Sequence, residues 1–116
     1  MKIREDFVTN SSSSSFVIAK HKNCTADDIK HAIYQHESKI TEIIDDYCAQ
    51  EEYPDLDIFV EDLTDELMRS AKGLTLDDWS VGSTMYSNED GAIDGFMYNY
   101  GHLLSSERFK ITCGAY

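Results

Sequence analysis

Apolar residues recur every three or four positions through the first half of the chain. At about 100° per residue these positions form one stripe of a helix, within about 60° of Ile40. Thr25 stands before the stripe as an N-cap, and Asp28, three residues later, completes a pair like a capping box. The pattern predicts one helix over residues 26–50. The stripe consists of Ile29, Ile33, His36, Ile40, Ile43, Ile44 and Tyr47.

A second helical stripe follows Pro54, the only proline of the chain. Proline interrupts a helix but fits the first turn of a new one, so it ends the first pattern and starts the next. Gly73 follows the last apolar position and is placed as a C-terminal cap. A helix over residues 55–72 is predicted, packed antiparallel against the first. Its apolar positions are Leu56, Phe59, Val60, Leu63 and Leu67.

Three short segments have the pattern of strands. Residues 16–20, FVIAK, are aromatic, β-branched and aliphatic. Residues 78–87, DWSVGSTMYS, carry Trp79, Val81 and Met85 at even spacing, interrupted by small residues. Residues 108–114 alternate apolar and polar side chains, as a half-buried strand does.

The segment 92–104 fits two periods. Six apolar positions suit a helical stripe, whereas three aromatic positions, at 96, 98 and 100, suit a strand. Gly95 and Gly101 would each cost a helix about 1 kcal/mol, but the larger number of matches favours the helix. The order of elements predicts a single α+β domain over residues 1–116: an antiparallel helix pair and a third helix, packed on a short antiparallel sheet.

Composition adds limits on the class of protein. A chain of 116 residues can bury about two-thirds of the surface that it exposes when unfolded, which allows a core. No apolar stretch approaches the length of about 20 residues that crosses a bilayer, so we expect a cytoplasmic protein with no membrane contact. The cysteines, Cys24, Cys48 and Cys113, are odd in number and lack CxxC spacing, which favours reduced thiols.

The negative charge is concentrated in one segment. The net charge is −12, and residues 37–66 hold twelve carboxylates against a single lysine, Lys39, so eleven of the twelve net charges lie there. On both predicted helices the carboxylates fall opposite the apolar stripe. One interpretation is a solvated face that keeps the protein in solution.

The second interpretation is a surface that binds a basic protein. A dense field of carboxylates can imitate phosphates, occupy a groove lined with Lys and Arg, and accelerate association. A divalent-cation loop is a weaker alternative, because the glycine and the acid spacing of an EF-hand are missing. Direct binding to nucleic acid is disfavoured, since no basic stripe is present. The candidate partner-binding residues are Glu42, Asp45, Asp46, Glu51, Glu52, Asp57, Glu61, Asp62 and Asp65.

Histidines and cysteines offer little catalytic signal. His21 and Cys24 form an H-x-x-C spacing without a second pair, so we expect no metal and no cofactor. His36 lies on the apolar stripe and is interpreted as a hydrogen-bonded core residue. Cys113 is expected to be a small core residue. No catalytic residue is assigned and no enzyme is expected, although a Cys–His pair that meets in space stays an open alternative.

Five serines follow Asn10, within a predicted Ser-rich loop at residues 8–15. A phosphate-binding loop needs glycines for close backbone approach, and this run has none. The opening MKIREDFVTNSSSSSFVIAK resembles that of many small, diverse and uncharacterised bacterial and phage proteins. The resemblance implies a bacterial or phage context and a role for the segment from Asn10 to Phe16, without an activity. The residues that carry it are Asn10, Ser11, Ser12, Ser13, Ser14, Ser15 and Phe16.

These observations predict a non-enzymatic acidic binding protein. Its concrete form is a phage-type inhibitor that occludes the nucleic-acid-binding site of a basic protein. One alternative is a small enzyme or ligand-binding domain that uses Ser11–Ser15 with His21 or Cys24. Another is an accessory protein with neither site.

Overall fold

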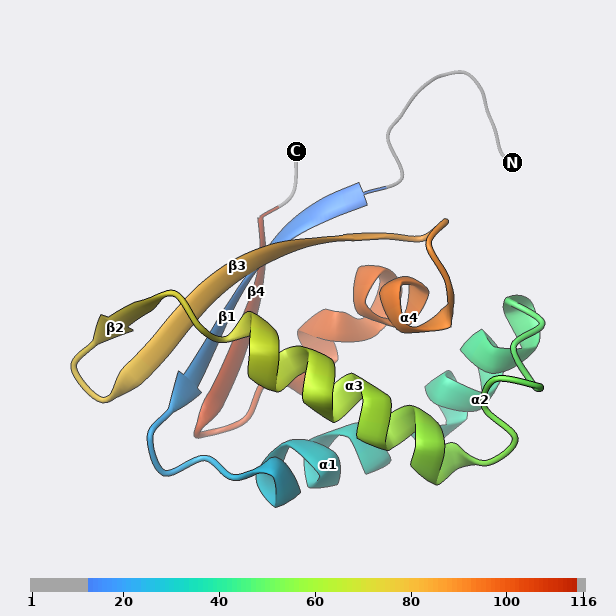
Figure 1. Cartoon of the computed structure of the whole chain (residues 1–116), viewed down its shortest axis with the longest axis horizontal. Helices are drawn as coiled ribbons and strands as arrows, with labels where there is room; N and C mark the ends of the chain where they lie inside the picture. The colour runs from blue at the N-terminus through green and yellow to red at the C-terminus, as the bar shows by residue number, and fades with distance from the viewer. Residues whose placement is uncertain (1–12, 115–116) are drawn as a thin grey trace.

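The computed structural model describes residues 13–114, which form a layer of helices on a four-stranded antiparallel sheet (Figure 1). The strands are β1 (Ser13–His21), β2 (Leu74–Leu76), β3 (Trp79–Ser87) and β4 (Phe109–Gly114). Their order is β2-β3-β1-β4, so the first strand in the sequence is central. β2 was not predicted, because its three residues are too few to show a period.

The helices are α1 (Ala26–Tyr34), α2 (Glu37–Asp46), α3 (Leu56–Ser70) and α4 (Ala92–Tyr100), and a 3-10 turn (Gly101–Leu104) follows α4. All of them lie on one face of the sheet (Figure 1). The predicted α+β fold is therefore confirmed, and so is the helix expected after residue 92. Among the described residues, no helix is both long and apolar enough to cross a bilayer.

The single helix predicted over residues 26–50 is wrong. The chain leaves the helical conformation at His36 (φ −119°, ψ 36°), where α1 has ended and α2 has not begun. His36 is half-buried, and its Nε2 lies 3.2 Å from the backbone oxygen of Leu103. The bend lets α1 pack mainly against α3, and α2 mainly against α4. The apolar spacing continues across the bend, so the periodicity gave no sign of it.

The second predicted helix is confirmed as α3. Asp55 caps its start and accepts a hydrogen bond from the Ile58 backbone nitrogen at 3.2 Å. The expected antiparallel partner is α1, because the Tyr34 hydroxyl at the end of α1 donates to the Asp57 carboxylate at the start of α3. The cap predicted at Gly73 is wrong: the helix ends at Ser70, and of the described glycines only Gly91 has positive φ.

Part of the serine run lies in a strand and not in a loop. Ser13, Ser14 and Ser15 belong to β1, where Ser14 pairs with Tyr86 and Ser15 with Met85. The prediction of a loop over residues 8–15 is wrong for these three, because pairing with β3 extends the strand beyond its apolar part. Asn10, Ser11 and Ser12 lie outside the described residues.

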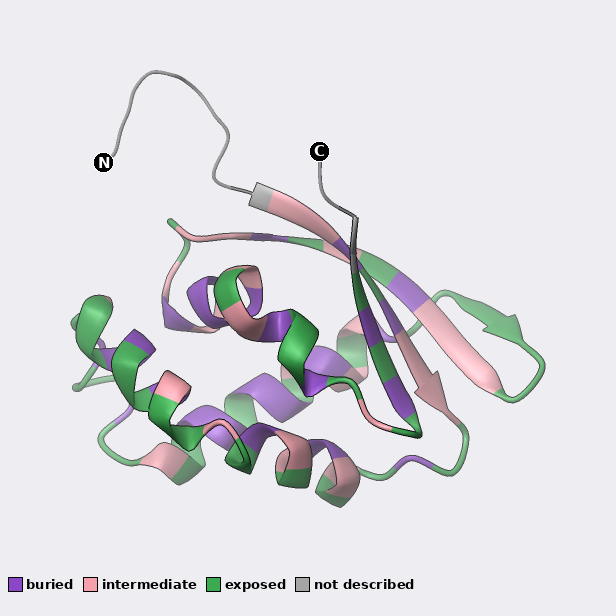
Figure 2. Cartoon of the chain, turned by 180° about the vertical axis from the view of Figure 1, so that it is seen from behind, coloured by how far each residue is buried: buried purple, intermediate pink, exposed green. Residues whose placement is uncertain are grey.

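The core lies between the inner sheet face and the helices, as the alternation of buried and exposed strand residues shows (Figure 2). Phe16 and Ile18 of β1 are buried there, and the Phe16 ring contacts Tyr86 edge-on with centroids 5.4 Å apart. Each fully buried side chain of this size contributes about 1.5–3 kcal/mol through the hydrophobic effect. Phe16, the last residue of the N-terminal resemblance, is thus a core residue.

The free edge of β4 is protected by the loop before it. The Ser105 hydroxyl accepts from the Ile111 backbone nitrogen at 3.0 Å and donates to the Ile111 oxygen at 3.3 Å. Ser106 pairs in the same way with Phe109 through the backbone. Unpaired strand edges invite pairing with another chain, so these contacts restrict sheet extension at this edge.

Candidate functional site

The nine acidic residues predicted to bind a partner are all exposed. They lie on α2, on the link over residues 47–55, and on α3. The link and the start of α3 meet beside α2 at one end of the molecule (Figure 1). We call this region, residues 42–66, the acidic end.

Carboxylates of α3 divide between its two flanks. On the α1 side, Asp57 accepts the Tyr34 hydrogen bond, and Glu61 lies 4.0 Å from the Lys30 ammonium. On the α4 side, Asp62 and Asp65 line a hollow. The structure therefore places the α3 acids on one helix but on two different surfaces.

α2 contributes its acids near α4 and the link. Glu42 accepts from the Tyr100 hydroxyl at 2.5 Å, and this hydrogen bond raises the pKa of the phenol. The Lys39 ammonium lies 5.2 Å from the centroid of the Tyr100 ring. Asp45 accepts from the Gln50 amide at 3.0 Å. These contacts hold the side chains of Glu42 and Asp45 in place, and none of them puts a cation beside Asp45.

The acidic link is anchored by Tyr53. Its side chain is buried, and its ring packs edge-on against Phe59 with centroids 5.1 Å apart. Burial, together with the charges of Glu52 and Asp62, raises the pKa of the phenol to about 12. Glu51 and Glu52 lie exposed beside this anchor. The link is thus fixed at one buried aromatic residue and presents its carboxylates outward.

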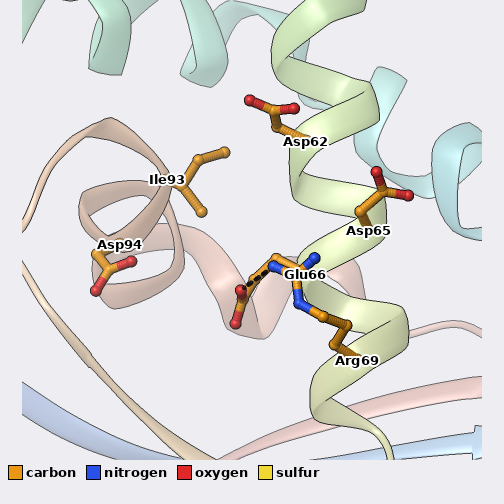
Figure 3. A pocket seen from close by; sticks show the side chains of 6 residues that line it. All are labelled: Asp62, Asp65, Glu66, Arg69, Ile93 and Asp94. Carbon is orange, nitrogen blue, oxygen red and sulfur yellow. Dashed lines mark hydrogen bonds and ion pairs between the residues drawn. The ribbon is translucent and has the colours of Figure 1, made fainter.

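A hollow of about 400 Å³ opens between α3 and α4 (Figure 3). Ile93 supplies an apolar wall, and Arg69 lies at the α3 side. Like charges this close repel one another, so the hollow favours a cation over an anion. Its carboxylates come from both helices: Asp62, Asp65, Glu66 and Asp94.

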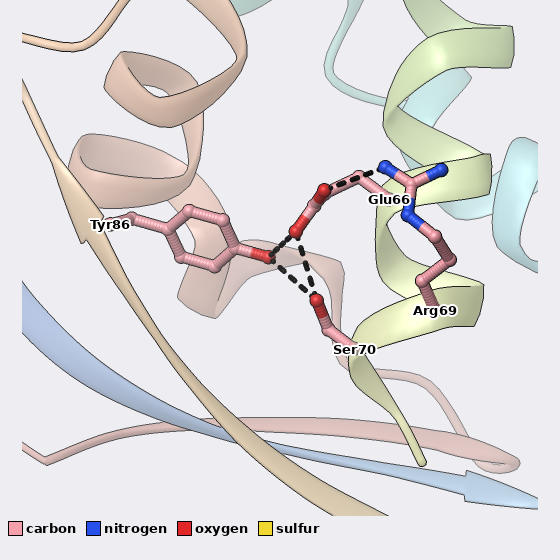
Figure 4. A network of polar contacts seen from close by, with 4 residues as sticks. All are labelled: Glu66, Arg69, Ser70 and Tyr86. Carbon is pink, nitrogen blue, oxygen red and sulfur yellow. Dashed lines mark hydrogen bonds and ion pairs between the residues drawn. The ribbon is translucent and has the colours of Figure 1, made fainter.

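A polar network holds Glu66 at the base of this region (Figure 4). Its Oε2 accepts from the Tyr86 hydroxyl at 3.0 Å and from the Ser70 hydroxyl at 2.9 Å. Its Oε1 accepts from Arg69 at 2.9 Å. Burial raises the pKa of Tyr86, so this phenol stays a neutral donor. The network fixes α3 to β3 and orients one carboxylate toward the hollow.

Sequence reasoning missed Glu66, Asp94 and Tyr86 as members of this site. The spacing of Glu66, Arg69 and Ser70 on one helix flank was a usable signal. Tyr86 and Asp94 gave none, because they reach the site only through the pairing of β3 and the packing of α4.

Asp94 lines the hollow from α4, and its surroundings shift the pKa of its carboxyl. Burial, followed by the charges of Asp90 and Glu66, raises the pKa of its carboxyl. The folded state therefore holds the proton more tightly than the unfolded state, and ionised Asp94 destabilises the fold above its folded pKa. We expect Asp94→Asn to increase the free energy of unfolding at neutral pH, with a gain that shrinks as the pH falls through the folded pKa and vanishes below the unfolded one.

Chemical denaturation at several pH values from neutral to acid checks this prediction. Asp27→Asn is the control, since Asp27 is exposed on α1 and has no place in the hollow. A gain for Asp94→Asn that stays constant across the pH range would contradict the assignment.

Positive charge lies mainly away from the acidic end. Within the described residues, ion pairs from cations to its carboxylates involve only Glu61 and Glu66. At the opposite end Lys22 pairs with Asp78 at 3.2 Å, and Arg108 lies 3.9 Å from Asp28. The charge of the molecule is therefore polarised along its length.

The serines of the candidate catalytic site are not brought to His21 and Cys24, which one turn holds together. Ser15 and His21 lie toward opposite ends of β1, roughly 20 Å apart at 3.3 Å per residue. The Cys24 thiol is buried, and burial followed by the charge of Asp28 raises its pKa, opposite to what a nucleophile needs. Within residues 13–114 no group of His, Cys, Asp and Glu side chains could hold a metal ion. The Cys113 side chain lies outside the described part.

Comparisons of the chain with protein-family models, with curated proteins and with solved structures find no match. The N-terminal resemblance to small bacterial and phage proteins stays an expectation.

Proposed function

We propose that the protein is a non-enzymatic binding protein that docks its acidic end on a basic protein surface. In the concrete version it is a phage-type inhibitor that covers the nucleic-acid-binding site of its partner. The observation that carries the proposal is the acidic end itself: its carboxylates are fixed on two helices and a link, are exposed, and within residues 13–114 mostly have no cation beside them.

The hollow between α3 and α4 offers an anchor for a basic side chain of the partner. A Lys or Arg side chain combines an apolar stem with a charged head. Ile93 would contact the stem, and Asp62 and Asp65 would accept hydrogen bonds from the head. Because Glu66 is already held by Arg69 and Tyr86, an incoming cation meets a pre-organised carboxylate wall.

The polarised charge supports fast and oriented association. A molecule that carries its negative charge at one end approaches a basic surface with that end first. Asp57 and Glu61 lie one turn apart on the α1 side of α3, about 6 Å along the helix axis, and Asp62 and Asp65 lie on its α4 side. These two pairs would occupy Lys and Arg side chains that otherwise contact a phosphate backbone.

Neutralising carboxylates of the acidic end should weaken partner binding. We expect a triple variant with Asp46→Asn, Asp62→Asn and Asp65→Asn to bind at least about tenfold more weakly, because several charge pairs across the interface are lost together. The measurement is affinity capture from a bacterial lysate at low and high salt. Captured proteins are then purified and titrated with the variants and with competing double-stranded DNA.

A matched triple variant, with Asp27→Asn, Asp77→Asn and Glu107→Gln, removes the same number of charges outside the acidic end. It should keep the wild-type affinity. Capture by the wild type should fall at high salt, and DNA should compete for the captured protein. Equal losses for the two triple variants, or capture that no DNA displaces, would contradict the proposal.

A further inference from the structure

The outer sheet face, which the helices leave uncovered, carries a group of apolar side chains across β2, β3 and β1. In the register of the sheet, Leu76, Trp79 and His21 form one row across β2, β3 and β1, and the Trp79 and His21 rings lie 5.2 Å apart. Four of the seven large apolar side chains that are exposed in the described residues lie on this face. They are Val17 (44%), Leu74 (58%), Leu76 (53%) and Met85 (62%).

The strand positions of this face carry no carboxylate. By strand pairing, the outward residues of the described strands include one lysine, Lys110, and no Asp or Glu. Acid reaches the face only at its rim, where the Asp78 carboxylate of the β2–β3 turn lies 4.0 Å from the His21 ring. Soluble proteins rarely expose a large contiguous apolar patch unless it meets a partner.

We propose that the outer sheet face binds the same face of a second copy of this chain, forming a two-fold symmetric, sheet-on-sheet dimer. Apolar faces of two sheets pack about 10 Å apart, and the two copies then direct their helices away from each other. Both helix layers then lie outside the pair of sheets, so the acidic ends are farther apart than the spacing of about 10 Å between the sheets, which already exceeds the Debye length of about 8 Å at physiological salt. Charge repulsion, the main obstacle to self-association of this chain, is therefore smallest in this arrangement.

Two other arrangements of copies fit less well. A head-to-tail contact would bury carboxylates of the acidic end against apolar side chains, which is costly, and would not close into a dimer. Edge pairing through β4 is restricted at Phe109 and Ile111, whose outward backbone groups already bond to Ser106 and Ser105. Face-to-face contact leaves both of these features undisturbed.

The size of the face sets the strength of the contact. Strand spacing and length give roughly 450 Å² per copy, or about 900 Å² buried in total. This is slightly below the area of about 1,000 Å² that a stable interface exceeds, so the dimer should be reversible and dissociate on dilution.

The test uses the full chain under reducing conditions, because Cys48 is an exposed free thiol. Sedimentation equilibrium from about 1 µM to about 1 mM should show a monomer–dimer equilibrium. Trp79 is the only tryptophan, so its emission should shift to shorter wavelength as the dimer forms. Higher salt should leave the dimer unchanged or tighter, opposite to its expected effect on docking by the acidic end.

A double variant with Leu76→Lys and Met85→Lys should weaken dimerisation by about tenfold or more and remove the concentration dependence of Trp79 emission. Both positions are exposed in the monomer, so the fold should survive, as far-UV circular dichroism would show. The control, Ile58→Lys with Leu103→Lys, adds the same charge at exposed apolar positions elsewhere and should dimerise like the wild type. A wild-type protein that stays monomeric at about 1 mM, or equal weakening in both double variants, would overturn the proposal.

Discussion

Gly82→Ala should lower the free energy of unfolding by about 3 kcal/mol or more, the largest loss that we expect from any single added methyl group. Gly82 lies on the inner side of β3, where the chain leaving α3 crosses the strand. A Cβ atom at this position would lie 2.0 Å from the Ser70 oxygen, and 2.8 Å and 2.9 Å from the Lys72 oxygen and nitrogen. These are backbone atoms, so no side-chain rotation can relieve the overlap.

Equilibrium denaturation by urea, followed by far-UV circular dichroism, measures this loss. The matched control is Ser83→Ala at the neighbouring position, which is exposed on the outer sheet face and should change stability by less than about 0.5 kcal/mol. A Gly82→Ala protein as stable as this control would show that the end of α3 does not pack on β3 at this point.

Phe59→Ala should lower the free energy of unfolding by about 3–5 kcal/mol. Phe59 is fully buried on α3 and lies in a row of aromatic rings that joins the acidic link to α4. Its centroid is 5.1 Å from that of Tyr53 and 5.7 Å from that of Phe96, both edge-on. Removing the ring leaves a cavity and also loses these two aromatic contacts.

Loss of the Phe59 ring should loosen the acidic link as well as lower the global stability. Tyr53 loses the ring against which it packs, so the link should exchange its amide hydrogens faster in Phe59→Ala than in the wild type. Ile58→Ala, one residue away and 40% exposed, is the control and should cost about 1 kcal/mol or less. Unchanged exchange in the link would show that Tyr53 is held by other contacts.

Much of the fold follows from local pattern. α3 has an uninterrupted apolar stripe after Pro54, and both features were visible in the sequence, whereas its cap at Asp55 is known from the structure. Alternation placed β3 and β4 near their observed positions. In each case the burial of one face determines the period of the sequence, which is why the period predicts the element.

The wrong predictions concern segments whose conformation is determined by tertiary contacts. The bend at His36 leaves the apolar spacing intact, and only the packing of α1 and α2 against different helices requires it. Ser13–Ser15 adopt strand geometry because β3 extends beside them, although serine has no strong preference for a strand. Neither contact can be found within the segment itself.

Some features of the candidate site could be predicted from the sequence, and others depend on tertiary packing. Exposure of the seven acids on the helices followed from their position opposite the apolar stripes, and Glu51 and Glu52 lie in the link between them. The hollow did not, because Asp94 joins Asp62 and Glu66 only when α4 packs beside α3. The apolar outer sheet face was likewise hidden, since inward and outward positions of β3 cannot be distinguished before the pairing with β1 is known.

The central place of β1 determines the order in which the protein can be completed. β1 leaves the ribosome before every other described element, yet its two neighbours in the sheet are distant in the sequence: Ile18 pairs with Gly82 on one side and with Ile111 on the other. During synthesis α1, α2 and α3 are made first, so Phe16 and Ile18 have no strand partner until β3 is made and no second partner until β4, the last described element, is made. Such long sequence separations slow folding, and exposed apolar strands favour aggregation while they wait. Production of this protein should therefore depend more on what shields its first strand during translation than on the stability of its finished fold.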